Sequence, residues 1–163
     1  MRGIRAKIVE RIQSEIGSMW TACLGVVTKA GTTVVDVQVK NKLMKDGEEI
    51  TFPIIKNVPV LHYKTSNFYI ASPLEVGDVV LLVFLKFNSN DFLDTANMLQ
   101  SPDGRMFNFN DVICISGFFL TDETPVIQTG EAVIKHKSGS YIRFSENGDI
   151  TIASKGEVNI IEI

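Results

Sequence analysis

The segment 134–163 repeats one pattern every eight residues. In each of the first three units, two side chains spaced two positions apart precede a polar segment that contains a glycine. The paired positions of the four units are Ile134 and His136, Ile142 and Phe144, Ile150 and Ile152, and Val158 and Ile160. A period of two predicts a β-strand with one buried face, and a glycine gives the backbone the freedom to turn. The segment is therefore predicted to consist of very short strands joined by tight turns.

Short strands of this kind cannot bury their apolar side chains alone, because repeat architectures gain stability only when neighbouring units complete a core. Other copies of the same chain are the simplest source of the missing wall, and cyclic symmetry brings identical faces together around one axis. We therefore expect a short intertwined β-helix or β-prism of three chains, with the eight paired residues as the trimer core. The alternative is a plain β-meander packed on the rest of its own domain.

His136 stands out in this pattern, because the other three units carry Phe144, Ile152 and Ile160 at the same phase. One interpretation is a ring of imidazoles around the symmetry axis that holds an ion or a water molecule. The other is a polar first layer of the prism, partly solvated. The sequence leaves both open, but the polar layer is the favoured interpretation, so we expect no resident metal or cofactor.

The remainder of the chain predicts an N-terminal helix and a β-barrel. Residues 1–19 form the expected amphipathic helix, with Ile4, Ile8, Ile12 and Ile16 as a candidate assembly contact on the domain itself or on another protein. Residues 20–120 are expected to form a small barrel, 121–131 a connector, and 132–163 the repeat. The strand candidates are Trp20–Thr28, Thr33–Lys40, Ile50–Ile55 (interrupted by Pro53), Val58–Tyr63, Phe68–Ala71, Val79–Phe87 and Val112–Leu120, with a loop tip at Lys45–Glu48 and an irregular stretch at 88–110.

The composition excludes several classes of function. The chain has 163 residues and a net charge of −3, whereas proteins that bind a phosphate backbone are usually basic. Its longest apolar run, Val79–Leu85, is far shorter than a membrane span, and charged residues throughout Arg2–Glu15 argue against a secretory signal. We therefore expect a soluble protein made in the cytoplasm, with Cys23 and Cys114 as buried, reduced thiols.

Catalytic motifs are not found in the sequence, so we expect no enzyme. His62 and His136 are the only imidazoles, and the acidic side chains are scattered over turns. An aromatic stripe of Phe52, Tyr63, Phe68 and Tyr69 allows the alternative of a barrel that binds single-stranded nucleic acid. Lys56 and Lys64 are the only basic residues near it, so core packing or a subunit contact is the favoured interpretation of the stripe.

Three segments together resemble a known family. They are Val58-Pro59-Val60, the run Ser72–Phe84 that contains Val76-Gly77-Asp78-Val79, and the closing segment Asp111–Phe118. In this order, and followed by an eight-residue β-repeat, they are similar to the N-terminal domain of small baseplate spike proteins of contractile-tailed phages. The resemblance covers roughly residues 20–119, and its most specific part is Ser72–Phe84.

The resemblance implies an OB-fold barrel followed by a three-chain β-helical spike, and so an all-β protein with a terminal helix. It implies a structural baseplate hub or central spike of a phage tail or tail-like contractile injection system, which penetrates the host envelope or attaches a tip. The implied partners are two further copies, tail-tube or hub proteins at the barrel end, a separate tip protein at the C-terminal end and, transiently, the host membrane. Related spikes carry a longer β-helix and often a His-x-His iron site, both of which this sequence lacks.

Overall fold

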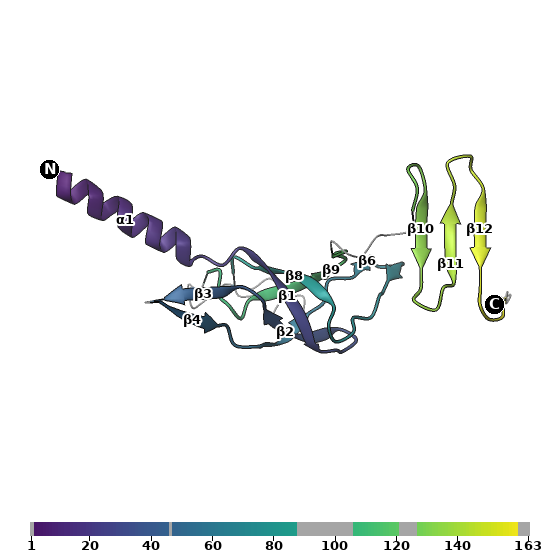
Figure 1. The fold of residues 1–163 in the computed structure, drawn as a ribbon, viewed down its shortest axis with the longest axis horizontal. Coiled ribbons are helices and arrows are strands. Elements are labelled where there is room, and N and C mark those ends of the chain that lie inside the picture. Colours follow the sequence, from purple (N-terminus) through teal and green to yellow (C-terminus); the bar gives the residue numbers. More distant parts are fainter. Residues whose placement is uncertain (1, 46, 88–105, 121–126, 160–163) are drawn as a thin grey trace. The chain divides into compact units, whose positions relative to one another are not determined.

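The structure, a computed structural model, describes residues 2–45, 47–87, 106–120 and 127–159. It divides into two compact units, residues 1–118 and 119–163. The described residues form one helix and twelve strands, so the protein is mainly β, as predicted (Figure 1). Parts of the predicted irregular stretch (88–110) and connector (121–131) lie outside the described residues, and so does Ile160.

Helix α1 spans Arg2–Ser18, one residue short of the predicted end. The backbone N–H of Met19 donates to the carbonyl of Ile16 at 3.2 Å and closes the last turn. Three residues separate the helix from the first strand. One of them, Trp20, packs against the core of the barrel, so the chain enters the barrel directly after the helix.

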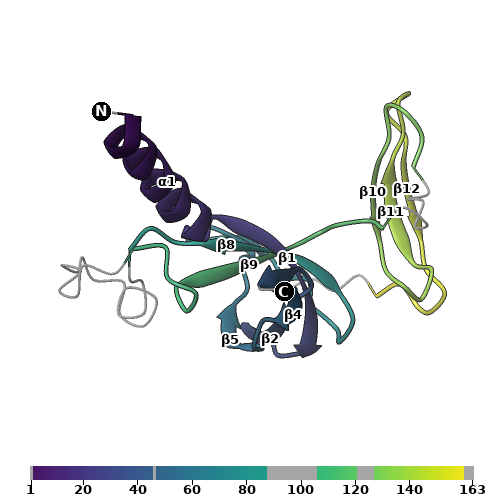
Figure 2. The ribbon, with the colours of Figure 1, turned by 60° about the vertical axis from the view of Figure 1, so that its left-hand side comes forward.

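Five strands form one curled sheet, in the order β5-β2-β1-β8-β9. Their bounds are β1 Ala22–Lys29, β2 Val34–Val39, β5 Ile55–Pro59, β8 Val79–Phe84 and β9 Val112–Ser116. All four pairings within the sheet are antiparallel. Beyond β5 the two ends of the sheet meet through a parallel bridge between Val60 and Cys114, where the N–H of Leu61 donates to the carbonyl of Cys114 at 2.8 Å. Figure 2 shows this curled sheet, which is consistent with the predicted OB-like fold.

The core of the barrel lies on the inner face of this sheet. In β2 the valines at 35, 37 and 39 are buried and alternate with partly exposed polar residues, which is the pattern of a strand with one face toward solvent. In β8 the buried positions are Val80, Leu82 and Phe84. At one end Trp20 lies with its ring centroid 4.8 Å from Phe52 and 5.0 Å from Phe109, and these aromatic side chains cover the end of the core.

Two hairpins differ from the sequence-based expectation. Strands β3 (Lys42–Lys45) and β4 (Glu48–Thr51) pair antiparallel on either side of the predicted loop tip. Strand β3 was not predicted, and β4 ends before Pro53, whereas the predicted strand continued to Ile55. The predicted strand Val58–Tyr63 is also wrong, because the chain leaves the sheet after Val60 and forms a separate hairpin. That hairpin pairs β6 (Tyr63–Lys64) with β7 (Tyr69–Ile70).

The C-terminal unit contains a three-stranded antiparallel sheet in the order β10-β11-β12. Its strands are β10 Ala132–Lys135, β11 Tyr141–Phe144 and β12 Ile150–Ala153 (Figure 1). The turns between them use Gly139 and Gly148, which have φ values of 96° and 90° that L side chains rarely adopt. A single chain thus has short strands and tight turns, as predicted, with the connectivity of a meander.

The two cysteines lie on different strands of the barrel. Cys23 and Cys114 both pair with Leu82, one from each neighbouring strand. Strands are spaced about 4.8 Å apart, so the two Cα atoms are about 10 Å apart, beyond the reach of a disulfide. Burial raises the pKa of both thiols, that of Cys114 to about 11. Both cysteines are free; Cys114 is buried, as predicted, whereas Cys23 is only partly buried.

Candidate assembly interface

The isoleucine and phenylalanine side chains of the C-terminal sheet lie on one face. Ile142 in the central strand pairs with Ile134 on one side and with Ile152 on the other. Phe144 pairs in the same way with Ala132 and Ile150. Directly paired residues project to the same side of a sheet, as do residues two apart on one strand. We call this set the apolar face: Ala132, Ile134, Ile142, Phe144, Ile150 and Ile152.

This face is open in the single chain. Ile134, Ile150 and Ile152 are 63–64% exposed, and even the central Ile142 is 36% exposed. A shallow hollow of about 330 Å³ lies along the isoleucine row and is also lined by His136 and Val158. Isoleucine and phenylalanine are usually buried in folded proteins, and contiguous exposed apolar patches mark interaction sites. The apolar face is therefore a candidate interface.

Seven of the eight predicted core residues fall within the described part of the chain, and the structure brings them to this sheet. The octad pattern also missed one member, Ala132, which lies opposite Phe144 at the start of the sheet. A strand that begins two residues before the first repeat is hard to detect from periodicity, since alanine gives a weak apolar signal.

His136 follows β10 and begins the turn to β11. Its backbone N–H donates to the carbonyl of Ser140 at 2.9 Å, which continues the strand pairing by one step. Its Nδ1 accepts from the backbone N–H of Ser138 at 3.2 Å and lies 2.9 Å from the hydroxyl of the same serine. The ring is thus oriented by the turn. Within the described residues of one chain, no three His, Cys, Asp or Glu side chains gather as a metal site, which does not test a ring shared by three chains.

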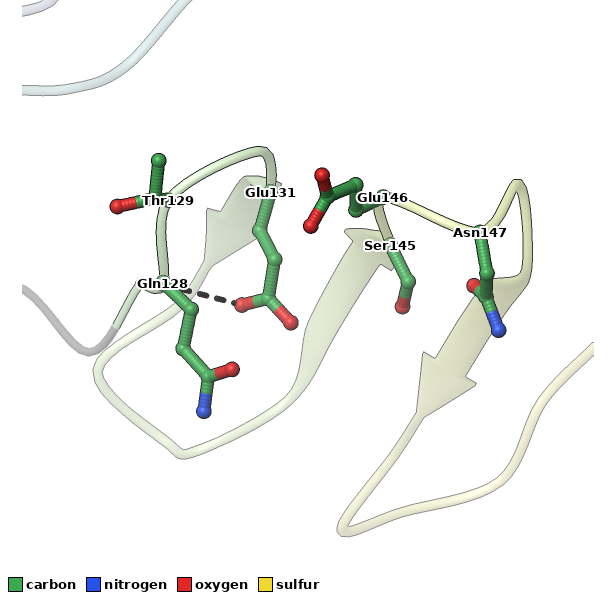
Figure 3. A pocket seen from close by; sticks show the side chains of 6 residues that line it. All are labelled: Gln128, Thr129, Glu131, Ser145, Glu146 and Asn147. Carbon is green, nitrogen blue, oxygen red and sulfur yellow. Dashed lines mark hydrogen bonds between the residues drawn. The ribbon is translucent and has the colours of Figure 1, made fainter.

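The opposite face of the sheet is different in character. The guanidinium of Arg143 lies over the ring of Tyr141, 5.2 Å from its centroid, and its Nε is 3.9 Å from a carboxylate oxygen of Glu131. A polar hollow of about 380 Å³ lies between the turn before β10 and the turn between β11 and β12 (Figure 3). There the backbone N–H of Gln128 donates to the carboxylate of Glu131 at 3.1 Å. The Glu131 carboxylate is engaged in these contacts, and the side chains of this face are partly covered by one another.

Helix α1 carries the second candidate surface. The four isoleucines predicted as an assembly contact are between 52% and 72% exposed. The predicted alternative, a helix whose isoleucines are covered by its own domain, is therefore not what the single chain shows.

The aromatic stripe proposed from the sequence is divided by the fold. Phe52 packs with Trp20 at the edge of the core, whereas Tyr63, Phe68 and Tyr69 are exposed on the β6–β7 hairpin. Tyr63 and Phe68 contact each other edge to face, with centroids 6.0 Å apart. Lys64 is the basic residue of this hairpin, so the stripe does not form the continuous aromatic and basic groove expected for a single-stranded nucleic acid.

Comparison with known proteins assigns residues 25–117, which lie in the N-terminal unit, to a family. In the described part of the chain no helix combines the length and the apolar character needed to span a membrane. Among curated proteins, nothing matches this sequence. The family described as "Phage protein Gp138 N-terminal domain" matches residues 25–117, which is more than half of the chain. The match supports the prediction of a phage structural protein and a virion-associated location. The chain belongs to the family of the phage protein Gp138 N-terminal domain.

Proposed function

We propose that this protein is a structural hub or central spike of the baseplate of a phage tail or of a tail-like contractile injection system. It acts as a homotrimer at the tip of the tube. The observation that supports the proposal is the exposed apolar face of the C-terminal sheet, whose two rows of side chains are not covered by any described part of the same chain.

Burial of this face is the driving force for assembly. Burying one isoleucine or phenylalanine side chain completely stabilises a protein by roughly 1.5–3 kcal/mol. Five such side chains on each chain are exposed by a third or more. Three copies around one axis would place Ile142 against Ile142 and Phe144 against Phe144, and the number three rests on the resemblance to phage spike proteins.

The same assembly accounts for the two outer strands. Within the described chain, β10 and β12 each pair on one side only. Unpaired strand edges favour association with other chains. Pairing these edges between copies gives a prism with main-chain hydrogen bonds all around it, which resists bending when force is applied along its axis.

The proposed role is mechanical and needs no catalysis, metal or cofactor. The barrels contact tail-tube or hub proteins, the C-terminal end of the prism contacts the host envelope or a separate tip protein, and nucleic acid is not a partner. The particle is the virion tail baseplate or a related injection particle.

The solution mass of the protein tests this proposal directly. The intact chain should have the mass of a trimer by light scattering at micromolar concentration. A version that ends at Gln128 lacks all three strands of the apolar face and should be monomeric. A monomeric intact chain would overturn the proposed function. Equal trimer content in both versions would move the interface from the C-terminal sheet to the barrel or the helix.

A further inference from the structure

The isoleucines of α1 form a surface that the proposed prism does not use. Ile4, Ile8, Ile12 and Ile16 recur every four residues and are each more than half exposed. Successive residues of an α-helix are rotated by about 100°, so these four side chains cover an arc of about 120°. An apolar arc of that width is typical of a helix that packs on another element along its whole length.

A solvated helix gains nothing from this choice of residues. Isoleucine is a poorer helix former than alanine or leucine, because its branched side chain loses rotamer freedom against the preceding turn. Isolated helices shorter than about 12–15 residues are marginal in water even for alanine-rich sequences, and α1, with 17 residues that include four isoleucines, is only slightly longer. The stability of α1 therefore depends on something that covers the isoleucine row.

We propose that α1 packs against the α1 helices of two further copies and forms a parallel three-helix bundle. This inference rests on the proposed trimer. In parallel coiled coils, isoleucine at both core positions shifts the preference from two helices to three or four. A trimer joined elsewhere also holds the three helices at high effective concentration, so that modest contacts suffice.

The sequence also predicts the geometry of the bundle. The core spacing of four residues is longer than the helical repeat of about 3.6, so the row shifts by about 40° around the helix from one isoleucine to the next. The helices must therefore cross or coil to the right to keep the row in contact. Only residues 19–21 join α1 to β1, and three residues span about 10 Å at most. Trp20 within that linker is packed on the barrel, so the first residues of the three β1 strands must lie close to the symmetry axis.

The net charge of α1 distinguishes a bundle of α1 helices from the docking of α1 on an acidic partner. Helix α1 contains four basic and two acidic side chains, a net charge of +2, whereas the whole chain has −3. Three copies of a basic helix repel one another, and added salt screens that repulsion. A bundle held by isoleucine should therefore persist or strengthen at high salt, while docking on an anionic protein or lipid surface should weaken.

Site-specific crosslinking tests the bundle in the intact chain. An Ile8→Cys variant places three thiols near the axis, and a short bismaleimide should join them at pH 7. Gln13→Cys is the matched control, because position 13 lies about 120° away from the centre of the row. The unsubstituted protein is the blank. Burial raises the pKa of both native thiols, so at pH 7 they should react little with the maleimide.

We expect at least tenfold more crosslinked chains for Ile8→Cys than for Gln13→Cys, and no loss of yield in high salt. Equal yields, or none, in a protein that still has the mass of a trimer would overturn the bundle and leave the proposed function intact. A monomeric mass would instead overturn the proposed function, and with it the bundle.

A double substitution distinguishes packing from helix propensity. Ile8→Ala with Ile12→Ala raises the intrinsic preference for helix, because alanine is the best helix former. If the isoleucines are buried in a bundle, the circular dichroism signal of α1 should fall all the same, while the trimer mass is retained. An unchanged or larger helical signal would show that α1 does not depend on a packed row.

Discussion

The barrel and the C-terminal sheet use similar apolar residues and differ in what covers them. In the barrel Val37 is fully buried, while Ile150 in the C-terminal sheet is 64% exposed. The barrel has five strands in a sheet whose ends meet, so one face curls around its own core. The C-terminal sheet has three strands of four residues, and its isoleucine and phenylalanine side chains project to the same open side.

The difference shows how the number and curvature of the strands determine whether a sheet can bury its apolar face within one chain. A sheet that curls far enough to meet itself removes its edges and buries its inner face within one chain. Three short strands cannot close, so an apolar face on them is stable only against another surface. Apolar alternation alone therefore predicts a buried face, and the length and number of strands predict whether the cover comes from the same chain.

The contrast between the two sheets depends most on the proposal that the apolar face is an interface. Phe144→Asp would bury three carboxylates around one axis, and breaking the interface in this way should abolish assembly, because uncompensated buried charges cost several kcal/mol each. The measurement is the mass in solution, with the fold of the barrel followed by circular dichroism. Thr151→Asp adds the same charge to the opposite face of the sheet and should leave the mass unchanged. A Phe144→Asp protein that keeps the mass of a trimer would show that this face is not the interface.

A core substitution in the barrel tests the other half of the comparison. Leu82 is fully buried between β1 and β9, so Leu82→Ala should lower the free energy of unfolding by about 2–5 kcal/mol through lost burial and a residual cavity. Urea unfolding of the version that ends at Gln128 measures this effect without the contribution of assembly. Leu24→Ala removes the same atoms from a side chain that is 45% exposed and should cost much less. Equal losses would mean that Leu82 is not a core residue of the folded barrel.

Much of this division could be predicted from the sequence. The helix, the central barrel strands and the short C-terminal strands have clear apolar periods, and Pro53 lies between β4 and β5, where a break was expected. The β3–β4 hairpin was missed because its strands have little alternation and are exposed where described. It is joined by contacts across the pair, such as the ion pair of Lys42 with Glu49.

The closure of the barrel was not readable from the sequence either. The parallel bridge of Val60 to Cys114 joins residues far apart in the chain, and a positive φ of 56° at Asn57 redirects the backbone shortly before it. Local patterns do not encode such a contact. The proposed partner of the apolar face lies outside a single chain, so the sequence and the single-chain structure point to it only through an exposed apolar surface.

Gly25 offers a finer test of how tightly the barrel is packed. A Cβ atom at this position would overlap Cγ1 of Val37 and lie 3.3 Å from Cδ1 of Leu82. Gly25→Ala should therefore destabilise the barrel by about 1–3 kcal/mol, as expected for overpacking. Combining it with Val37→Ala removes the overlapping methyl group, so the double variant should lose less than the sum of the two single losses. Strictly additive losses in urea unfolding would argue against the close contact of β1 with β2.

The smallest expected effect concerns the thiol of Cys114 and reports burial in the barrel. Burial raises its pKa from 9.0 to about 11, so the folded protein holds this proton at pH values where the unfolded chain has released it. Between about pH 9 and 11 the unfolded state therefore binds fewer protons, and the free energy of unfolding should fall as pH rises. Cys114→Ala removes this titration, so the difference in stability between the two proteins should be constant below pH 9 and should shift against the unsubstituted protein above it. Tyrosine and lysine titrate equally in both, and a difference that stays constant up to pH 11 would show that the folded barrel does not shield this thiol from water.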